Sequence, residues 1–278
     1  MKCKTMIPLA TAALASISLQ TKAAITLGTA GDFAVLAGSA VTNTGLSVIA
    51  EGHVGVSPGF AITGFPPGIV VPPFTMHAGD PVALQAQVDL IVAYNAASGL
   101  TPTQDLTGQD LGGLTLVPGV YFFSSSAQLT GALTLDAQGD PNAEFVFQIG
   151  STLTTASNSS VRTINIGPLP APLGPDAIAI DPIPGCRVFW QVGNFATLGT
   201  GTEFDGHILA LESITLNAGT SMDGSALARN GAVTLDTTSV FNCVIPEPAT
   251  MTLALFGVAL LGFRRAASGR VSFAGPRG

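Results

Sequence analysis

Residues 197–214 read TLGTGTEFDGHILALESI, residues 215–233 read TLNAGTSMDGSALARNGAV, and the pattern begins again with TLDTTS at residues 234–239. The first two lines agree at eight of eighteen positions, including the opening Thr-Leu pair and the Asp-Gly pairs at 205–206 and 223–224. An internal repeat of this length is typical of a solenoid, in which each repeat forms one coil of a continuous stack. The stretch therefore predicts stacked coils of 18–19 residues.

The repeat length also predicts the shape of each coil. Eighteen or nineteen residues divide into three sides of about six, because the strands of such coils are short and each corner takes a small residue. Alternate residues along a side point inward and outward. We therefore expect a triangular coil in which the leucine of each Thr-Leu pair faces the core and the threonine faces solvent.

The Thr-Leu pair recurs at 115–116, 134–135 and 152–153, so successive pairs are separated by 19, 18, 45, 18 and 19 residues. Placing the coils in one register predicts a second file of short hydroxyl side chains on a flat side, at Thr155, Ser157, Thr200, Thr202, Thr220, Thr237 and Ser239. Such an array suits a periodic ligand, either an ice surface or a regular polymer. In the alternative interpretation, threonine is a good strand residue and the side is ordinary solenoid surface.

Composition favours an all-β domain without an anionic partner. Charged residues are only 10% of the chain, and the apolar residues come in short alternating runs. Between residues 24 and 245 there are three basic residues, all arginine, and sixteen acidic ones (17 in the chain minus Glu247), which gives 3 − 16 = −13. Binding to nucleic acid or to anionic lipid is therefore not expected, since both require neutralisation of phosphate.

Both ends of the chain have the composition of targeting segments. Residues 1–24 combine Lys2 and Lys4, an apolar run and a small-residue site near Ala23, which is the pattern of a secretory signal. At the other end, an apolar run over 251–263 is shorter than the ~20 residues that usually span a bilayer. The intervening residues 25–243 are the predicted solenoid domain.

The C-terminal segment 244–265 resembles the PEP-CTERM sorting signal of Gram-negative bacteria. It has the triplet Pro246, Glu247 and Pro248, then the apolar run, then Arg264 and Arg265, and a tail follows at 266–278. The resemblance implies export, transient insertion in the inner membrane and processing by an exosortase. It further implies delivery to the cell surface or the extracellular matrix.

Two cysteines, Cys186 and Cys243, remain after removal of the signal. In an exported protein such a pair is most simply a disulfide. The competing interpretation is a metal or catalytic thiol, but His53, His77 and His207 share no ligand spacing with the cysteines or with each other. We expect neither a metal nor a cofactor.

Three segments depart from the strand pattern. Residues 80–98 predict one long helix with Asp80 as its N-cap and Pro81 in its first turn. Leu84, Val88, Ile91, Val92 and Asn95 follow helical spacing, so we expect this apolar face to be covered. The prolines of 57–76 predict a loop or cap, and those of 167–185 predict an exposed, extended excursion.

A catalytic site is an alternative, because β-helices also host polysaccharide lyases and hydrolases. Asp205 and Asp223 fall one coil apart, as a carboxylate pair or calcium site would require, but each precedes a glycine, which is the composition of a tight corner. Phe189 and Trp190 have apolar neighbours that favour core packing over sugar stacking. We therefore expect a non-enzymatic protein.

Several runs, taken in order, resemble the microbial ice-binding proteins with a discontinuous β-solenoid. They are LGTAGDFAVLAG at 27–38, VGVSPG at 54–59, AQVDL at 86–90, LVPGVY at 116–121, FVFQIGSTL at 145–153, VFWQVG at 188–193 and ALARNGAVTL at 226–235. The resemblance implies a right-handed triangular β-helix flanked by one long helix, with N-terminal strands that supply coils out of sequence order. It also implies ice binding through a flat face, in some members with a Thr-Ala/Gly-x-Thr/Asn pattern. Thr155-Ala-Ser-Asn158 fits that pattern and adds Asn158 to the predicted contact residues, whereas the next coil ends the pattern with Glu203.

The leading hypothesis is an exported, surface-associated β-solenoid that binds ice through its Thr/Ser face. A structural or adhesive matrix protein without ice affinity is the alternative from another class. A polysaccharide-active enzyme is the third.

Overall fold

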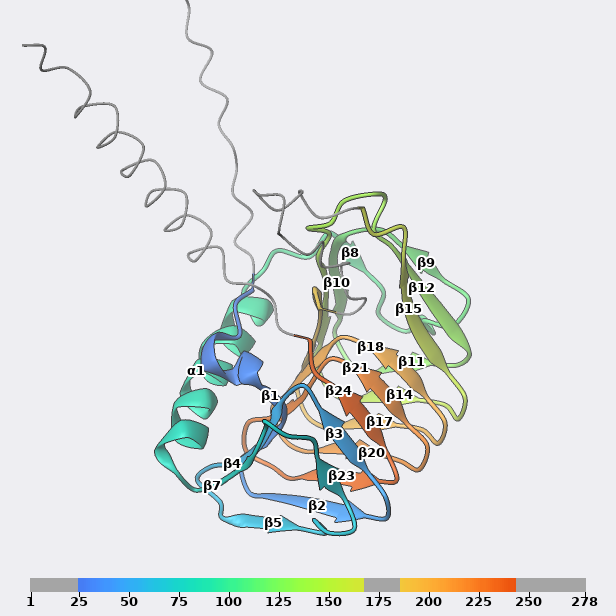
Figure 1. The fold of residues 1–278 in the computed structure, drawn as a ribbon. Coiled ribbons are helices and arrows are strands. Elements are labelled where there is room, and N and C mark those ends of the chain that lie inside the picture. The colour runs from blue at the N-terminus through green and yellow to red at the C-terminus, as the bar shows by residue number, and fades with distance from the viewer. Residues whose placement is uncertain (1–24, 168–185, 244–278) are drawn as a thin grey trace, which may run out of the picture.

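The alternating runs of the repeat fold as short parallel strands, one on each side of a triangular coil (Figure 1). The structure is a computed structural model that describes residues 25–167 and 186–243. Sheet A contains, in spatial order, β7 (Met76–Ala78), β4 (His53–Val56), β1 (Phe33–Ala37), β22 (Ala226–Ala228), β19 (His207–Ala210), β16 (Val188–Val192), β13 (Phe145–Ile149), β10 (Gly119–Phe123) and β8 (Gln104–Asp105).

The two other sheets complete the triangle. Sheet B contains β11 (Ala127–Leu129), β14 (Leu153–Thr155), β17 (Ala196–Leu198), β20 (Ile214–Leu216), β23 (Val233–Asp236), β2 (Ala40–Thr44) and β5 (Ala61–Thr63). Sheet C contains β6 (Ile69–Val70), β3 (Val48–Ala50), β24 (Ser239–Phe241), β21 (Ser221–Asp223), β18 (Glu203–Asp205), β15 (Ser160–Ile164), β12 (Ala132–Asp136) and β9 (Thr115–Leu116). The predicted triangular all-β solenoid is confirmed.

The coils do not stack in sequence order. The last coil, formed by β22, β23 and β24, stacks on the N-terminal coil formed by β1, β2 and β3. The helix α1 (Pro81–Ser98) follows β7 at one end of sheet A and leads toward β8 at the opposite end. The discontinuity implied by the family resemblance is therefore present.

The proline-rich residues 57–76, which the sequence predicts as a loop or cap, form most of a terminal coil. They supply β5 and β6, and β7 begins at Met76, so each of the three sheets has one of these strands at its edge. An edge strand needs hydrogen-bond partners on one side only, which is where proline is tolerated. The second proline-rich segment falls largely within 168–185, outside the described residues. The signal and sorting segments also lie outside them.

The interior of the coils is a continuous apolar stack. Phe147 and Trp190, one coil apart, stack with ring centroids 3.8 Å apart, and Trp190 donates from Nε1 to the backbone oxygen of Asp205 at 3.1 Å. Phe189, on the other face of sheet A, is fully buried under α1. Core packing of both aromatic residues is confirmed.

The helix packs on sheet A with the face opposite to the predicted one. Ala83, Ala86, Leu90, Ala93 and Ala97 are buried, because small side chains allow the helix to lie close to the sheet. The predicted buried face, with Leu84, Val88, Ile91, Val92 and Asn95, is exposed. The extent of the helix and its Asp80 cap, which accepts from the Ala83 amide at 2.9 Å, are confirmed. No helix within residues 25–167 and 186–243 has the length and apolarity needed to cross a membrane.

The predicted disulfide joins Cys186 to Cys243, across a sequence separation of 57. The single register predicted for the Thr-Leu pairs is wrong. Thr115 and Thr134 pair with each other in sheet C, whereas Thr197, Thr215 and Thr234 pair in sheet B. Thr152-Leu153 does begin the sheet B side of its coil, but it is displaced by two residues from Thr197-Leu198, since the residue opposite Thr197 is Thr154.

Candidate functional site

The outer side of sheet B carries one unbroken file of threonines. Thr154 pairs with Thr197, Thr197 with Thr215, Thr215 with Thr234, Thr234 with Thr42, and Thr42 with Thr63. Six coils in succession therefore place a threonine at the same outward position, about 4.8 Å apart. These six residues, the threonine file, are all exposed or half-buried.

The surface around the threonine file is smooth and nearly uncharged. Two residues before each threonine, the successive coils place small side chains at Thr152, Ser213, Ala232, Ala40 and Ala61, with Phe195 as the single large exception among the six coils. Asp236, at the end of β23, is the single charged residue within the described strands of sheet B. Gln128 in β11, opposite Thr154 and one coil beyond the threonine file, is a longer exposed side chain at the edge of the sheet.

The two other sheets do not offer such a surface. Sheet A is covered by α1, whose Gln87 and Tyr94 donate to the backbone oxygens of Ala228 and Val192. Sheet C carries Arg162, Glu203, Asp205 and Asp223 along its length. Among the described faces, sheet B is therefore the flat, nearly uncharged one.

Three of the predicted contact residues lie inside the protein. Thr155, Thr202 and Thr220 are 3%, 0% and 1% exposed. The hydroxyls of Thr155 and Thr202 are 2.8 Å apart, and the Thr202 hydroxyl also donates to the Gly199 oxygen at 2.7 Å. Their prediction as surface contacts is wrong, because at the corner between sheets B and C they point inward and satisfy backbone groups.

The other predicted contact residues are accessible but do not form one file. Ser157, Asn158, Thr200 and Thr237 are exposed in the corner turns between sheets B and C. Ser239 is half-buried and begins β24 in sheet C, opposite Ser221. These residues border sheet B and do not lie on its flat surface.

The threonine file was not included among the predicted contact residues, although its signal was present. The Thr-Leu pair marks Thr197, Thr215 and Thr234 as outward residues, whereas Thr42 and Thr63 precede asparagine or glycine and carry no such mark. Glu203, which departs from the Thr-Ala/Gly-x-Thr/Asn pattern, begins β18 on sheet C and pairs with Arg162. It therefore does not interrupt sheet B.

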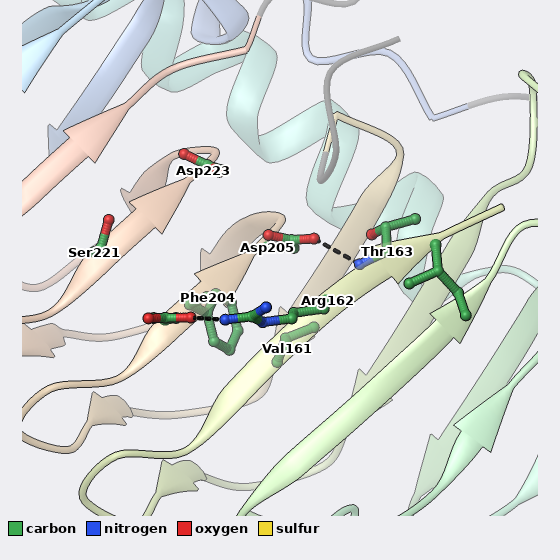
Figure 2. A pocket seen from close by; sticks show the side chains of 9 residues that line it. Val161, Arg162, Thr163, Phe204, Asp205, Ser221 and Asp223 are labelled. Atoms are coloured by element: carbon green, nitrogen blue, oxygen red, sulfur yellow. Dashed lines mark hydrogen bonds and ion pairs between the residues drawn. The ribbon is translucent and has the colours of Figure 1, made fainter. Parts of the chain in front are cut away.

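Sheet C contains a groove of about 390 Å³ where β15 and β18 separate. The two strands are in register only at Ser160 and Glu203, whereas β12 and β15 pair over five residues. Figure 2 shows Asp205 directed across this gap toward Thr163, and the Thr163 amide donates to the carboxylate Oδ2 at 2.8 Å. The groove is lined by Val161, Arg162, Thr163, Ile164, Glu203, Phe204, Asp205, Ser221 and Asp223.

Burial raises the pKa of two aspartates in the groove. Burial raises the pKa of Asp205 to about 6, against the hydrogen bonds from Thr163. Burial and the nearby Glu51 also raise the pKa of Asp223. Gly206 and Gly224, which follow the two aspartates, have φ angles of 120° and 148°, so these are the tight corners that the sequence predicted.

Two histidines that are distant in sequence meet near the N-terminus of α1. The rings of His53 and His77 lie 4.9 Å apart, and His77 Nδ1 is 2.7 Å from Asp80 Oδ2. Their spacing in the sequence gave no sign of this contact. Within the described residues, no group of three or more His, Cys, Asp or Glu side chains has a geometry suited to a metal ion.

The fold and the threonine file define the protein as a discontinuous β-solenoid with one flat, hydroxyl-bearing face. The chain belongs to the Ice-binding-like family, whose model matches residues 35–241. A PEP-CTERM protein-sorting motif matches residues 244–270, which indicates export and a membrane-anchored sorting signal.

Named relatives agree with this assignment over most of the chain. An ice-binding protein of Nostoc sp. (strain HG1) is 55% identical over 270 residues, and the match covers 93% of each of the two chains. The crystal structure of an ice-binding protein from the Antarctic ascomycete Antarctomyces psychrotrophicus has a TM-score of 0.70 at 36% identity, over 81% of this chain and 100% of that one. The structure of an ice-binding protein from an Antarctic Biological Consortium has a TM-score of 0.70 at 42% identity, over 85% and 96%.

Proposed function

We propose that the chain is a non-catalytic protein that binds ice through sheet B, with the threonine file as the centre of the contact. The observation that carries the proposal is the register of six outward threonines on a flat, nearly uncharged sheet. The similarity to relatives named as ice-binding proteins supports it.

A threonine file suits a crystalline ligand for a physical reason. The β-branched side chain is stiff at χ1, so its methyl and hydroxyl groups hold fixed positions. The parallel strands repeat these groups at a constant spacing of about 4.8 Å. Because the array is ordered before contact, little conformational entropy is lost when it meets an ordered layer of water.

In this proposal the activity is exerted outside the cytoplasm. We infer processing by an exosortase after transient insertion of the C-terminal segment in the inner membrane, and delivery to the surface or matrix of a Gram-negative cell. The match of the PEP-CTERM motif to residues 244–270 supports this proposal. The exposed corner residues Ser157, Asn158, Thr200 and Thr237, and the half-buried Ser239 at the start of β24, would then border the contact surface.

The test is to place a large ring on the flat face. The protein for the test comprises residues 25–245 and is produced by export, so that the disulfide forms. In the double variant Thr197→Tyr and Thr215→Tyr, the two rings hold the flat face away from a planar ligand. We expect thermal hysteresis and inhibition of ice recrystallisation to fall about tenfold or more, because the rings prevent close contact at the centre of the face. Thr134→Tyr on sheet C is the matched control and should retain both activities.

Two results would remove the proposal. If the unmodified domain shows neither activity, the chain is better described as a structural or adhesive matrix protein. If Thr134→Tyr is as damaging as the sheet B pair, sheet B is not the contact surface.

A further inference from the structure

The outer face of α1 is apolar, uncharged and without a partner among the described residues. Val82, Leu84, Val88, Ile91 and Val92 are 49%, 56%, 47%, 39% and 61% exposed. The one charged residue of the helix, Asp89, accepts from Thr29 and Gln85. Contiguous apolar patches of this kind on a soluble protein commonly mark an interaction surface.

The described chain ends beside this helix. Cys243 is fixed by its disulfide to Cys186, and the side chain of Asn242 donates to the Gly31 oxygen at 2.7 Å. Gly31 belongs to the 3₁₀ helix η1 (Gly28–Asp32), which packs against α1 (Figure 1). The sorting segment therefore begins at the edge of the molecule on which α1 lies.

The distance to the apolar part of the sorting segment is short. Residues 244–250 separate Cys243 from the apolar run at 251–263, and seven residues reach at most about 25 Å. The helix α1, with 18 residues, is itself about 27 Å long. A membrane that holds the apolar run is thus within reach of the α1 face.

We propose that the outer face of α1 rests on the lipid bilayer that holds the C-terminal sorting segment, so that sheet B is directed away from that bilayer. The strands that the helix contacts most extensively, β1, β4, β7, β13, β16 and β19, all belong to sheet A. In a triangular solenoid sheets A and B face different directions. The second half of the inference rests on the proposed function, since it states how the ice-binding face is presented before processing.

A bilayer fits this face better than a second copy of the chain does. Five partly exposed aliphatic side chains offer less than the ~800 Å² per partner that a stable dimer buries. An apolar helix face that is parallel to a bilayer inserts at the level of the headgroups, and the short tether supplies a high effective concentration. The acidic domain and the absence of Lys and Arg from α1 predict a preference for zwitterionic over anionic lipid.

The test uses the full chain without its signal, inserted in phosphatidylcholine vesicles. Val88→Cys on α1 and Thr215→Cys on sheet B each carry one fluorophore, since the two remaining native cysteines are joined in the disulfide. Nitroxide-labelled lipid should quench the label at residue 88 several-fold more strongly than the label at residue 215. If the sorting segment does not insert, a histidine tag after residue 248 and a nickel-chelating lipid supply the same tether.

Variants and lipid composition separate the outcomes. The change of exposed Val92 and Leu84 to aspartate should abolish the difference in quenching while the fold is retained, and anionic lipid should reduce it. Equal quenching at residues 88 and 215 would overturn the proposal, as would self-quenching at residue 88 in vesicle-free buffer, which would identify a second copy. Thermal hysteresis of the soluble domain is measured separately, so failure of ice binding is distinguishable from failure of lipid contact.

Discussion

The role of a threonine in sheet B and its corners depends on the direction of its side chain. Thr215 points outward, where its hydroxyl meets solvent, whereas Thr202 points into the corner between sheets B and C. The hydroxyl of Thr202 lies within hydrogen-bonding distance of Thr155 and Gly199. Thr202 therefore stabilises the fold, whereas Thr215 is part of the proposed contact surface.

Replacement of Thr202 by valine should destabilise the domain without a change in its binding face. Valine keeps the shape but leaves buried polar groups without a partner, so we expect a loss of about 1–2 kcal/mol in the free energy of unfolding. Urea unfolding measures this loss, and thermal hysteresis per folded molecule should be unchanged. Thr215→Val, at an exposed site, is the control and should change stability by less than ~0.5 kcal/mol. Equal destabilisation by both changes would contradict this division of roles.

Two buried titratable groups oppose each other in the pH dependence of stability. Burial raises the pKa of Asp205 from 3.8 to about 6. The contribution of Asp205 to the free energy of unfolding is therefore fully present below pH 3.8 and is lost as the pH rises through 6. Burial lowers the pKa of His207 from 6.5 to about 4, so its contribution is present above pH 6.5 and is lost as the pH falls through 4. Each effect is on the order of 3 kcal/mol, and between pH 4.5 and 6.5 they largely cancel.

Asp205→Asn should expose the contribution of His207. The variant should be more stable than the parent at pH 7.5, by up to about 3 kcal/mol, because no buried carboxylate has to ionise. Its stability should then fall steadily as the pH is lowered to 4.5, where the parent stays nearly level. Urea midpoints at four pH values measure both curves, with Asp32→Asn, at an exposed site, as the control. A variant with the pH profile of the parent would show that Asp205 does not control it.

At the scale of the elements, α1 is attached to sheet A by small residues and by a few buried hydrogen bonds. Gln148, which is 5% exposed in β13, donates from Nε2 to the backbone oxygens of Ala97 and Leu100, both at 2.8 Å. These carbonyls lie at the C-terminal end of the helix, where the backbone has no partner of its own. A side chain of the sheet thus completes the end of the helix.

Gln148→Ala should loosen this end of α1. Two carbonyl groups lose their donor, so we expect a loss of about 1–3 kcal/mol in stability and faster amide exchange in the last turn of the helix. Hydrogen exchange measured by mass spectrometry resolves that turn. Gln85→Ala, on the exposed side, is the control. Unchanged exchange near residue 97 in the Gln148 variant would contradict this attachment.

The sequence predicted the coils and the extent of the helix because both depend on local patterns. The repeat at 197–235 sets the coil length, and Asp80 with Pro81 sets the start of α1. The buried face of α1 was predicted wrongly because larger side chains were expected to be covered. Close packing on the sheet instead selects the alanine face and leaves Leu84 exposed.

The contact residues were harder to predict than the coils because they depend on register across coils. Thr155 was aligned with the exposed Thr200 of the next coil. The observed register instead places Thr155 beside Leu198, two residues earlier, in the inward column. Thr42 and Thr63 join the threonine file only because the N-terminal coils stack on the C-terminal ones. That stacking has no local signal and was implied only by the family resemblance.

At the scale of the whole molecule, the disulfide links the last described residue to the coil that follows the 168–185 segment. Cys243 is 2% exposed, and its partner Cys186 precedes β16 in sheet A. The link closes a loop with a sequence separation of 57. Closure of a loop of this length restricts the unfolded chain and corresponds to about 4 kcal/mol of stabilisation in the chain-entropy description.

Removal of the disulfide should therefore weaken the domain without disturbing sheet B. For the double variant Cys186→Ala and Cys243→Ala, we expect the free energy of unfolding to fall by about 2–4 kcal/mol, as measured by urea unfolding. The parent protein in reductant is the matched control and should show the same loss. Because the threonine file is held by its own parallel strands, thermal hysteresis should persist at temperatures where the variant remains folded. If a folded variant lost this activity, the geometry of sheet B would depend on the disulfide at Cys243 and not only on the strands of sheet B.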